Sequence, residues 1–346
     1  MIPFSQFEEP IAMKALLYEG PHQLRVVEMP IPTPQPDEVL LKVGACGICG
    51  SDVHGYTGES GRRTPGQVMG HEFAGRIATL GSEVSRWKPE DRVAAFNIVG
   101  CGQCPFCHVG QVQCCPNRKV IGVNTGKVGA YAEYVCVPAK NLAKVADDVP
   151  FGLALLNEPL AVAYHALSHV PEQAKSLVIV GGGTIGQCLT QVAKVLGKWT
   201  VYLVEPVEEK RKLAEKNGAI TLPPDLEELK THLPWGGDAS VEAVGIESTV
   251  QFALEAIRPA GTLVLLGNLA KQVSLPLQHI SSNEKHLVGT YGFNFQDFET
   301  IVSWINEGRF DLKPLLTGTC TLEETPEVFS DLAAGKRQAV KIVVEP

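Results

Sequence analysis

The chain has 346 residues, an apolar content of 45% and a formal net charge of −8. This length exceeds one compact core and predicts two domains. The acidic balance argues against general binding to nucleic acid or to anionic membranes. The N-terminus lacks the basic start and long apolar run of a signal peptide, and no apolar run is long enough to span a membrane. We expect a cytoplasmic protein whose residues before Met13 contribute little to chemistry.

The N-terminal part predicts an irregular β-rich domain. Between residues 14 and 42, short strand-like stretches alternate with turns, and the run M-P-I-P-T-P-Q-P cannot be helical because each proline fixes φ and removes a donor. Residues 38–43 and 129–137 also have strand character.

Two short motifs about 20 residues apart carry candidate ligands for a catalytic metal. Cys46 and Cys49 form a C-x-x-C pair, which by itself would suggest thioredoxin-type redox chemistry. His71 and Glu72 follow in the sequence G-H-E. A thiolate, an imidazole and a carboxylate together suit an open zinc site. Alone, Cys49 would fit a small buried hydrophobe and His71 a core histidine, so the combination indicates the site.

Four cysteines within a short lobe predict a second, structural zinc site. Cys101, Cys104, Cys107 and Cys115 have the spacing C-x2-C-x2-C-x7-C, which suits closed tetrahedral coordination. Cys114 leaves the fourth ligand ambiguous by one residue, and the spacing favours Cys115. A closed site offers no position to substrate, so it should only hold a loop in shape. A nucleic-acid-binding zinc finger is the alternative, but no basic recognition helix accompanies the cysteines.

Glu158 precedes an apolar helix predicted over 160–167. A carboxylate in apolar surroundings costs free energy unless it is paired or bound to metal, although it could instead be a favourable charge at a helix N-terminus. His165 and His169 are four residues apart, a spacing that can chelate a metal. Packing is the expected role, because the sequence indicates no third ligand.

The stretch 176–206 predicts a βαβ unit with a dinucleotide site. An apolar run over 177–180 is followed by G-x-G-x-x-G, with Thr184 and Ile185 opening a helix that Gly197 ends. The first glycine allows a tight turn, the second lets the backbone approach a pyrophosphate, and the third lets helix pack on strand. These glycines are Gly181, Gly183 and Gly186.

The next strand, over 201–204, ends at Glu205. A carboxylate here can bind both hydroxyls of an adenosine ribose and would repel a 2′-phosphate, so NAD is favoured over NADP. Lys210 and Arg211 follow and could soften that preference, although a solvated start of the next helix is the simpler role.

Strands and helices then alternate, which predicts a doubly wound parallel sheet. Strands are expected over 238–244, 261–267 and 287–290, and helices over 210–217, 248–257 and 298–308. The turns at Val244–Gly245 and Leu266–Gly267 follow strands, at the edge where nicotinamide and ribose would bind. The closing strand, V-K-I-V-V, should return to the first domain. Residues 261–267 and 273–277 could pair across a two-fold, so a homodimer or homotetramer is expected.

The ordered elements C-G-S-D-V-H, G-H-E, the four-cysteine lobe, N-E-P and G-G-G-T-I-G resemble the zinc-containing medium-chain dehydrogenase/reductase superfamily over nearly all the chain from Met13. The resemblance is greatest to its polyol (sorbitol dehydrogenase-like) and threonine dehydrogenase branch. It implies a GroES-like catalytic domain over 1–163 and 300–346, with the zinc lobe near 97–118, and a Rossmann NAD-binding domain over 164–299. It also implies one catalytic and one structural zinc per chain.

The resemblance implies that Cys49, not Cys46, and His71 bind the catalytic zinc. Glu72 occupies the next ligand position, and Glu158 lies near or on the metal, where the alcohol dehydrogenase branch has a cysteine.

Ser51 and His54 match the family's hydroxyl and histidine for a proton relay, whereas a surface histidine is the alternative for His54. Asp52 is expected to orient local backbone. Tyr291 stands in a region where sorbitol dehydrogenases tend to carry an arginine, which removes a basic contact to substrate.

The predicted activity is zinc-dependent, NAD-linked oxidation of a secondary alcohol (a polyol, sugar alcohol or diol) to a ketone. Ser51 would accept the proton, the ribose hydroxyls and His54 would pass it to solvent, and the nicotinamide would take the hydride. Oxidation of L-threonine or another amino alcohol is the alternative. A non-catalytic NAD-binding protein is a third hypothesis, but it would have little reason to combine these side chains. The expected partner is a small-molecule alcohol, with no nucleic acid or membrane.

Overall fold

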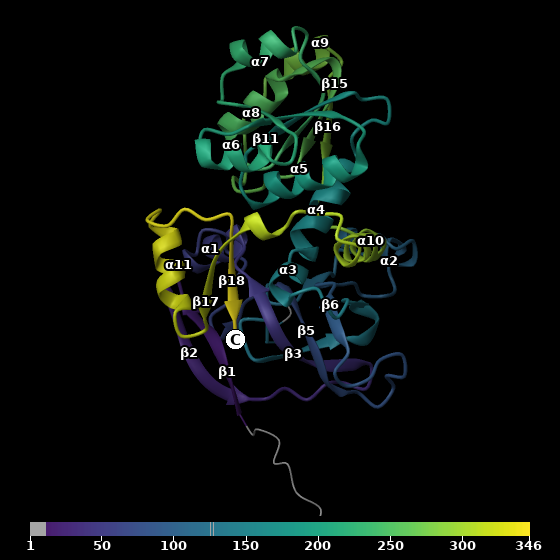
Figure 1. Cartoon of the computed structure of the whole chain (residues 1–346), viewed down its shortest axis with the longest axis vertical. Helices are drawn as coiled ribbons and strands as arrows, with labels where there is room; N and C mark the ends of the chain where they lie inside the picture. The colour runs from purple at the N-terminus through teal and green to yellow at the C-terminus, as the bar shows by residue number, and fades with distance from the viewer. Residues whose placement is uncertain (1–11, 125, 127) are drawn as a thin grey trace, which may run out of the picture. The chain divides into compact units, whose positions relative to one another are not determined.

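The computed structural model of the protein describes residues 12–124, 126 and 128–346 (Figure 1). The predicted N-terminal extension before Met13 lies almost entirely outside the described residues. Within them, no helix combines the length and apolar character needed to cross a membrane.

The chain forms two compact units, each made of segments that are distant in sequence. The first comprises Met1–Gly100, described from residue 12, with Asn117–Leu156 and Leu316–Pro346. The second comprises Cys101–Pro116 and Asn157–Leu315. In this division the cysteine lobe belongs to the second unit.

The first unit is built on β-sheets, and its helices are short. Its strands are β1 (Ala12–Gly20), β2 (Gln23–Pro30), β3 (Glu38–Gly47), β4 (Gln67–Val68), β5 (Glu72–Leu80), β6 (Arg92–Ala95), β7 (Ile98–Val99), β8 (Lys119–Val120), β9 (Tyr134–Pro138), β10 (Leu142–Lys144), β17 (Leu316–Thr321) and β18 (Lys341–Glu345). Its helices are α1 (Gly50–Tyr56), α3 (Phe151–Ala154) and α11 (Thr325–Ala333), with a 3-10 turn η2 (Ala139–Asn141).

The largest sheet of this unit joins the two ends of the chain. Its strand order is β10-β6-β5-β3-β18-β17, with β9 also paired to β3. In Figure 1 the yellow strand β18 accordingly lies between the purple β3 and the strand β17. The closing strand thus returns to the first unit, as its sequence predicts. Two smaller sheets, β2-β1-β4 and β7-β8, complete the unit.

The core of the first unit follows from strand alternation. Along β1, Met13 and Ala15 are buried while Lys14 is exposed, as expected for a strand with one face on a core. Tyr131 packs edge-on against Phe329 of α11 at a centroid distance of 5.8 Å, so the C-terminal helix also covers this core.

The second unit contains a six-stranded, wholly parallel sheet of order β13-β12-β11-β14-β15-β16. This confirms the predicted doubly wound fold. Its strands are β11 (Ser176–Val180), β12 (Thr200–Val204), β13 (Ile220–Leu222), β14 (Gly237–Glu242), β15 (Ile257–Leu265) and β16 (His286–Gly289). The remaining elements are α2 (Pro105–His108), η1 (Val112–Cys114), α4 (Asn157–Leu167), α5 (Thr184–Leu196), α6 (Glu208–Glu215), α7 (Leu226–His232), α8 (Glu247–Glu255), α9 (Leu277–Ser282), α10 (Phe295–Asn306) and η3 (Lys313–Leu315).

β15 departs from its sequence prediction in two respects. It begins at Ile257 rather than Gly261, because Ile257 pairs with Gly237 before a register shift. It also lies between β14 and β16, so both of its edges are occupied. The predicted pairing of 261–267 across a two-fold is therefore wrong, and β13 and β16 are the edge strands of this sheet.

The histidine pair of α4 has a partner that the sequence did not indicate. His165 Nδ1 lies 2.7 Å from Asp297 Oδ2 at the start of α10, and His169 packs edge-on against His165 at 5.2 Å. The pair thus joins α4 to α10, in line with the predicted packing role.

The contact between α5 and β11 depends on the third glycine of the loop. A Cβ at Gly186 would overlap the carbonyl oxygen of Gly181, so only glycine allows the helix to start this close to the strand. Gly183 has no atom within 4 Å of the position of its missing Cβ, which leaves its surface open.

We predict that Gly186→Ala destabilises the second unit. Overpacking against a backbone atom costs on the order of 1–3 kcal/mol, so thermal unfolding followed by circular dichroism should move to a lower temperature. Gly183→Ala is the matched control, because its methyl group meets nothing and its φ of −70° is ordinary. An equal loss of stability in both variants would contradict the packing role of Gly186.

Candidate active site and metal centres

Three predicted ligands of the catalytic metal lie together in the first unit. Cys49 is the residue before α1, and His71 and Glu72 stand at the start of β5. One ligand atom from each lies within 4.8 Å of those of the other two. His71 and Glu72 are buried and Cys49 is partly exposed. Cys46 is buried in β3 outside this group, so the geometry groups Cys49 with the other two.

Behind His71 lies a buried network centred on Asp52. The Asp52 side chain is fully buried, and it accepts hydrogen bonds from Arg63 Nη2 at 2.7 Å and from the Tyr131 hydroxyl at 2.8 Å. His71 Nδ1 lies 3.3 Å from Asp52 Oδ1. The expectation that Asp52 orients local backbone is therefore wrong, because its carboxylate contacts side chains.

The charges in this network support one another. Burial alone raises the pKa of Asp52, but attraction to His71 and Arg63 outweighs burial and holds that pKa below its usual range. Burial alone lowers the pKa of His71, but Asp52 raises it well above its usual value. Asp52 is thus an anion beside His71 Nδ1, so Nε2 is the ring nitrogen that a metal ion would bind, with release of its proton, as in metal-binding histidines that have a carboxylate behind them.

Lys341 contacts Glu72 from the closing strand, and sequence reasoning did not identify it. Lys341 Nζ lies 2.5 Å from Glu72 Oε2 and donates to the carbonyl oxygen of Ile48 at 3.1 Å. Both charged side chains are 1% exposed. The available signal was a lysine inside the apolar run V-K-I-V-V, since a buried cation requires a partner.

The residues of the predicted proton relay share helix α1. The Ser51 hydroxyl donates to Cys49 Sγ at 3.3 Å, and Ser51 is exposed. His54 is three residues further on, hence on the same face, and its Nδ1 lies 3.0 Å from Glu59 Oε2. The fourth predicted ligand, Glu158, belongs to the other unit, where it is partly exposed in the first turn of α4.

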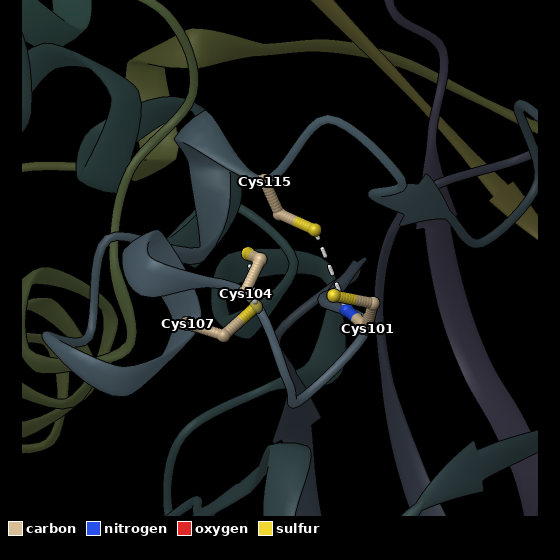
Figure 2. A group of neighbouring side chains, drawn as sticks. All are labelled: Cys101, Cys104, Cys107 and Cys115. Atoms are coloured by element: carbon tan, nitrogen blue, oxygen red, sulfur yellow. Dashed lines mark hydrogen bonds between the residues drawn. The ribbon is translucent and has the colours of Figure 1, made fainter.

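The cysteine lobe brings four sulfur atoms together (Figure 2). Cys101, Cys104, Cys107 and Cys115 lie within 4.8 Å of one another, around α2 and η1. The dashed line in Figure 2 marks the Cys101 backbone N–H donating to Cys115 Sγ at 3.4 Å. Cys114 is exposed and outside the group.

The pKa values of two thiols in this lobe are shifted in opposite directions. A backbone hydrogen bond from Gln103 lowers the pKa of Cys101 to about 7. A backbone hydrogen bond from Cys107 lowers the pKa of Cys104, but desolvation and neighbouring thiols outweigh it and raise that pKa to about 11. The sulfurs thus compete for protons. Four closely spaced thiols fit a tetrahedral zinc ion, whose binding would displace those protons.

The residues predicted to bind the dinucleotide lie at the carboxyl ends of the strands of the parallel sheet. Gly181 follows β11 with φ of 102°, which favours glycine, and the loop leads directly into α5. Glu205 follows β12, is buried, and accepts hydrogen bonds from the backbone N–H groups of Gly182 at 2.7 Å and Val207 at 3.0 Å. Arg211 donates to the carbonyl oxygens of Glu205 and Pro206 at 2.7 and 2.8 Å. Arg211 is therefore tied to this loop rather than simply solvated.

The turns after β14 and β15 contact each other at the same carboxyl ends of the strands. A Cβ at Gly267 would overlap the backbone nitrogen of Gly245, and a Cβ at Gly245 would overlap that of Asn268, so both positions require glycine. Glu242, which sequence reasoning did not identify, is fully buried and accepts hydrogen bonds from the N–H groups of Val244 and Gly245 at 2.9 and 2.8 Å. Its carbonyl oxygen accepts from Leu266 N–H at 3.0 Å. A carboxylate ending an apolar strand was the signal for this residue.

Comparisons with known proteins agree with this architecture. Residues 35–147 match the alcohol dehydrogenase GroES-like domain and residues 184–307 match the zinc-binding dehydrogenase domain. L-threonine 3-dehydrogenase of Pyrococcus furiosus is 32% identical, over 92% of this chain and 95% of the relative. Sorbitol dehydrogenase of Bacillus subtilis is 31% identical, over 97% and 98%.

Among solved structures, a zinc-binding dehydrogenase from Sinorhizobium meliloti bound to NADP superimposes with a TM-score of 0.89, at 32% identity. The match covers 97% of this chain and 99% of that one. The chain therefore belongs to the zinc-containing medium-chain dehydrogenase/reductase superfamily, in its polyol and threonine dehydrogenase branch.

Proposed function

We propose that the protein is a zinc- and NAD-dependent dehydrogenase that oxidises a secondary alcohol, of the polyol, sugar alcohol or diol class, to a ketone. The observation that carries the proposal is the convergence of Cys49, His71 and Glu72 within 4.8 Å, beside the Ser51 hydroxyl. A thiolate, a neutral imidazole and a carboxylate are ligands that leave an open position on zinc.

Cys49 and His71 are the proposed anchors of the catalytic zinc, with Glu72 beside them. When bound, zinc lowers the pKa of an alcohol ligand, as it does for water, and the nicotinamide accepts the hydride. The protein holds the ligands in place through Asp52, which fixes His71. The proposed structural zinc is held by the cysteine lobe.

Ser51 is the proposed acceptor of the substrate proton, and His54 passes it toward solvent. The contact of His54 Nδ1 with Glu59 supports this role, because it leaves the other ring nitrogen, Nε2, free to exchange the proton. His54 is 36% exposed at its side chain, so the proton has a route to water.

NAD is the proposed cofactor. The buried Glu205 carboxylate would repel a 2′-phosphate, and the Arg211 guanidinium is already engaged by two carbonyl oxygens. Because the similar structure from Sinorhizobium meliloti is bound to NADP, the preference of this chain between NAD and NADP is to be measured directly.

Oxidation of L-threonine is the second candidate, favoured by the match to a threonine dehydrogenase at the same level of identity as the match to a sorbitol dehydrogenase. Both substrates carry a secondary hydroxyl, so the same Ser51 relay would serve either.

The proposed activity is tested by an NAD-reduction screen over polyols, sugar alcohol phosphates, diols and L-threonine. We expect kcat/KM to be highest for a polyol, sugar alcohol phosphate or diol. Ser51→Ala should lower turnover on that substrate by on the order of 100-fold or more without loss of zinc, because it removes the proton acceptor. Ser60→Ala, in the loop that follows α1, is the control and should be unaffected. Unchanged turnover in Ser51→Ala would remove the relay, and preference for threonine would favour the second candidate.

Metal content measured by mass spectrometry tests the two ligand groups separately. We expect one zinc ion for each group in the wild-type chain. Cys49→Ser should lose the ion of the first group, and Cys104→Ser the ion of the lobe together with thermal stability, since structural zinc contributes folding energy. Cys114→Ser and Cys46→Ala are the controls and should retain both ions. Full zinc content in Cys49→Ser would contradict the proposed catalytic site.

Glu205→Ser should shift cofactor preference toward NADP. Removing the carboxylate abolishes repulsion of a 2′-phosphate and loses its bonds to the ribose, so we expect the ratio of kcat/KM for NADP to that for NAD to rise on the order of 10- to 100-fold. Glu215→Ser, at the far end of α6, should leave the ratio unchanged. A wild-type chain that already prefers NADP would overturn the assignment of Glu205.

A further inference from the structure

A buried ion pair joins Lys341 to Glu72, which belongs to the candidate metal group of Cys49, His71 and Glu72. Lys341 begins β18, at the C-terminal end of the chain, and is 269 residues from Glu72. Both side chains are 1% exposed, so neither charge is screened by water. Among the described residues, Lys341 is the cation in contact with the Glu72 carboxylate.

Backbone pairing holds the two side chains in place. In the largest sheet of the first unit, Gly47 of β3 is opposite Glu72 of β5 on one side and Val343 of β18 on the other. A Cβ at Gly47 would overlap Glu72 Oε2 and would lie 3.2 Å from Lys341 Cδ. The missing side chain of Gly47 therefore makes the space in which the carboxylate and the lysine stem meet.

Lys341 is anchored independently of Glu72. Its Nζ also donates to the carbonyl oxygen of Ile48 at 3.1 Å, and Ile48 N–H donates to the carbonyl oxygen of Ile342 at 2.9 Å. The ammonium is thus held between β18 and the residue just before the Cys49 ligand, where it faces the carboxylate at 2.5 Å.

We propose that Lys341 is a positioning residue of the zinc site: its ammonium anchors and neutralises the Glu72 carboxylate, so Glu72 lies beside the ion without adding a full negative charge to it. This inference rests on the proposed function. Because the Cys49 thiolate would offset only one of the two charges of the ion and the His71 imidazole is neutral, the ion would keep a net positive charge, which preserves its strength as a Lewis acid.

Lys341→Met tests this role. Without the ammonium, the metal ion becomes the cation nearest the Glu72 carboxylate, and the carboxylate should bind it more strongly. We expect release of the catalytic zinc to a chelator to slow on the order of tenfold, the size of effect that residues outside the ligand set have on metal affinity. The catalytic zinc is recognised by comparison with Cys49→Ser, because its release phase is absent from that variant. In cobalt-substituted protein, the visible absorption should change as the coordination changes.

The double variant Lys341→Met/Glu72→Gln guards against failure of the single variant to fold. It removes both charges and leaves no buried ion alone, so it should fold. Because the wild-type pair is neutral overall, we expect its zinc release to lie within about threefold of wild type. Lys14→Met, which removes a lysine from the exposed pair with Glu323, is the matched control and should match wild type.

Three results would overturn the inference. Lys341→Met could release the ion at the wild-type rate or faster, or its slowing could persist when Glu72→Gln is added. The double variant could also release the ion more than about tenfold faster than wild type, which would make Glu72 a ligand of full charge. Absence of zinc at Cys49 in the wild-type chain would instead contradict the proposed function itself.

Discussion

The pairing of β3 with β5 on one side and β18 on the other is the constraint on which the candidate catalytic site depends. It places β5 and the C-terminal strand β18 on the two sides of β3. Glu72 opens β5, Lys341 opens β18, and Cys49 follows the end of β3, so the three strand ends meet. A site assembled on strand ends is held by backbone hydrogen bonds, which limits how far its ligands can move.

A second layer of buried polar groups orients those ligands. Asp52 holds His71, Arg63 and the Tyr131 hydroxyl, and Lys341 holds Glu72. Buried charges are costly unless they are paired and hydrogen-bonded, so each group keeps the next in one position. The carboxyl ends of the parallel strands, where the dinucleotide is proposed to bind, are organised similarly, with Glu242 satisfying the N–H groups of the turn after β14.

The predictions from sequence succeeded where chemistry is local. The parallel sheet, the glycine loop entering α5 and membership of the dehydrogenase superfamily are confirmed. The four-cysteine spacing corresponds to sulfur atoms that lie within 4.8 Å, because ligands a few residues apart can surround an ion without help from distant strands. The predictions were wrong where the answer depends on neighbours: β15 is an interior strand, and Asp52 contacts side chains.

The sequence by itself determined the element types, the order of the motifs and the residue chemistry, since periodicity and motif spacing are properties of the chain alone. Only the tertiary structure decided which partners lie behind the candidate ligands. Arg63, Tyr131 and Lys341 are separated from Asp52 or Glu72 by 11, 79 and 269 residues, and no local pattern links them. Strand pairing and burial bring them together, because a charge removed from water is stable only beside a partner that the fold supplies.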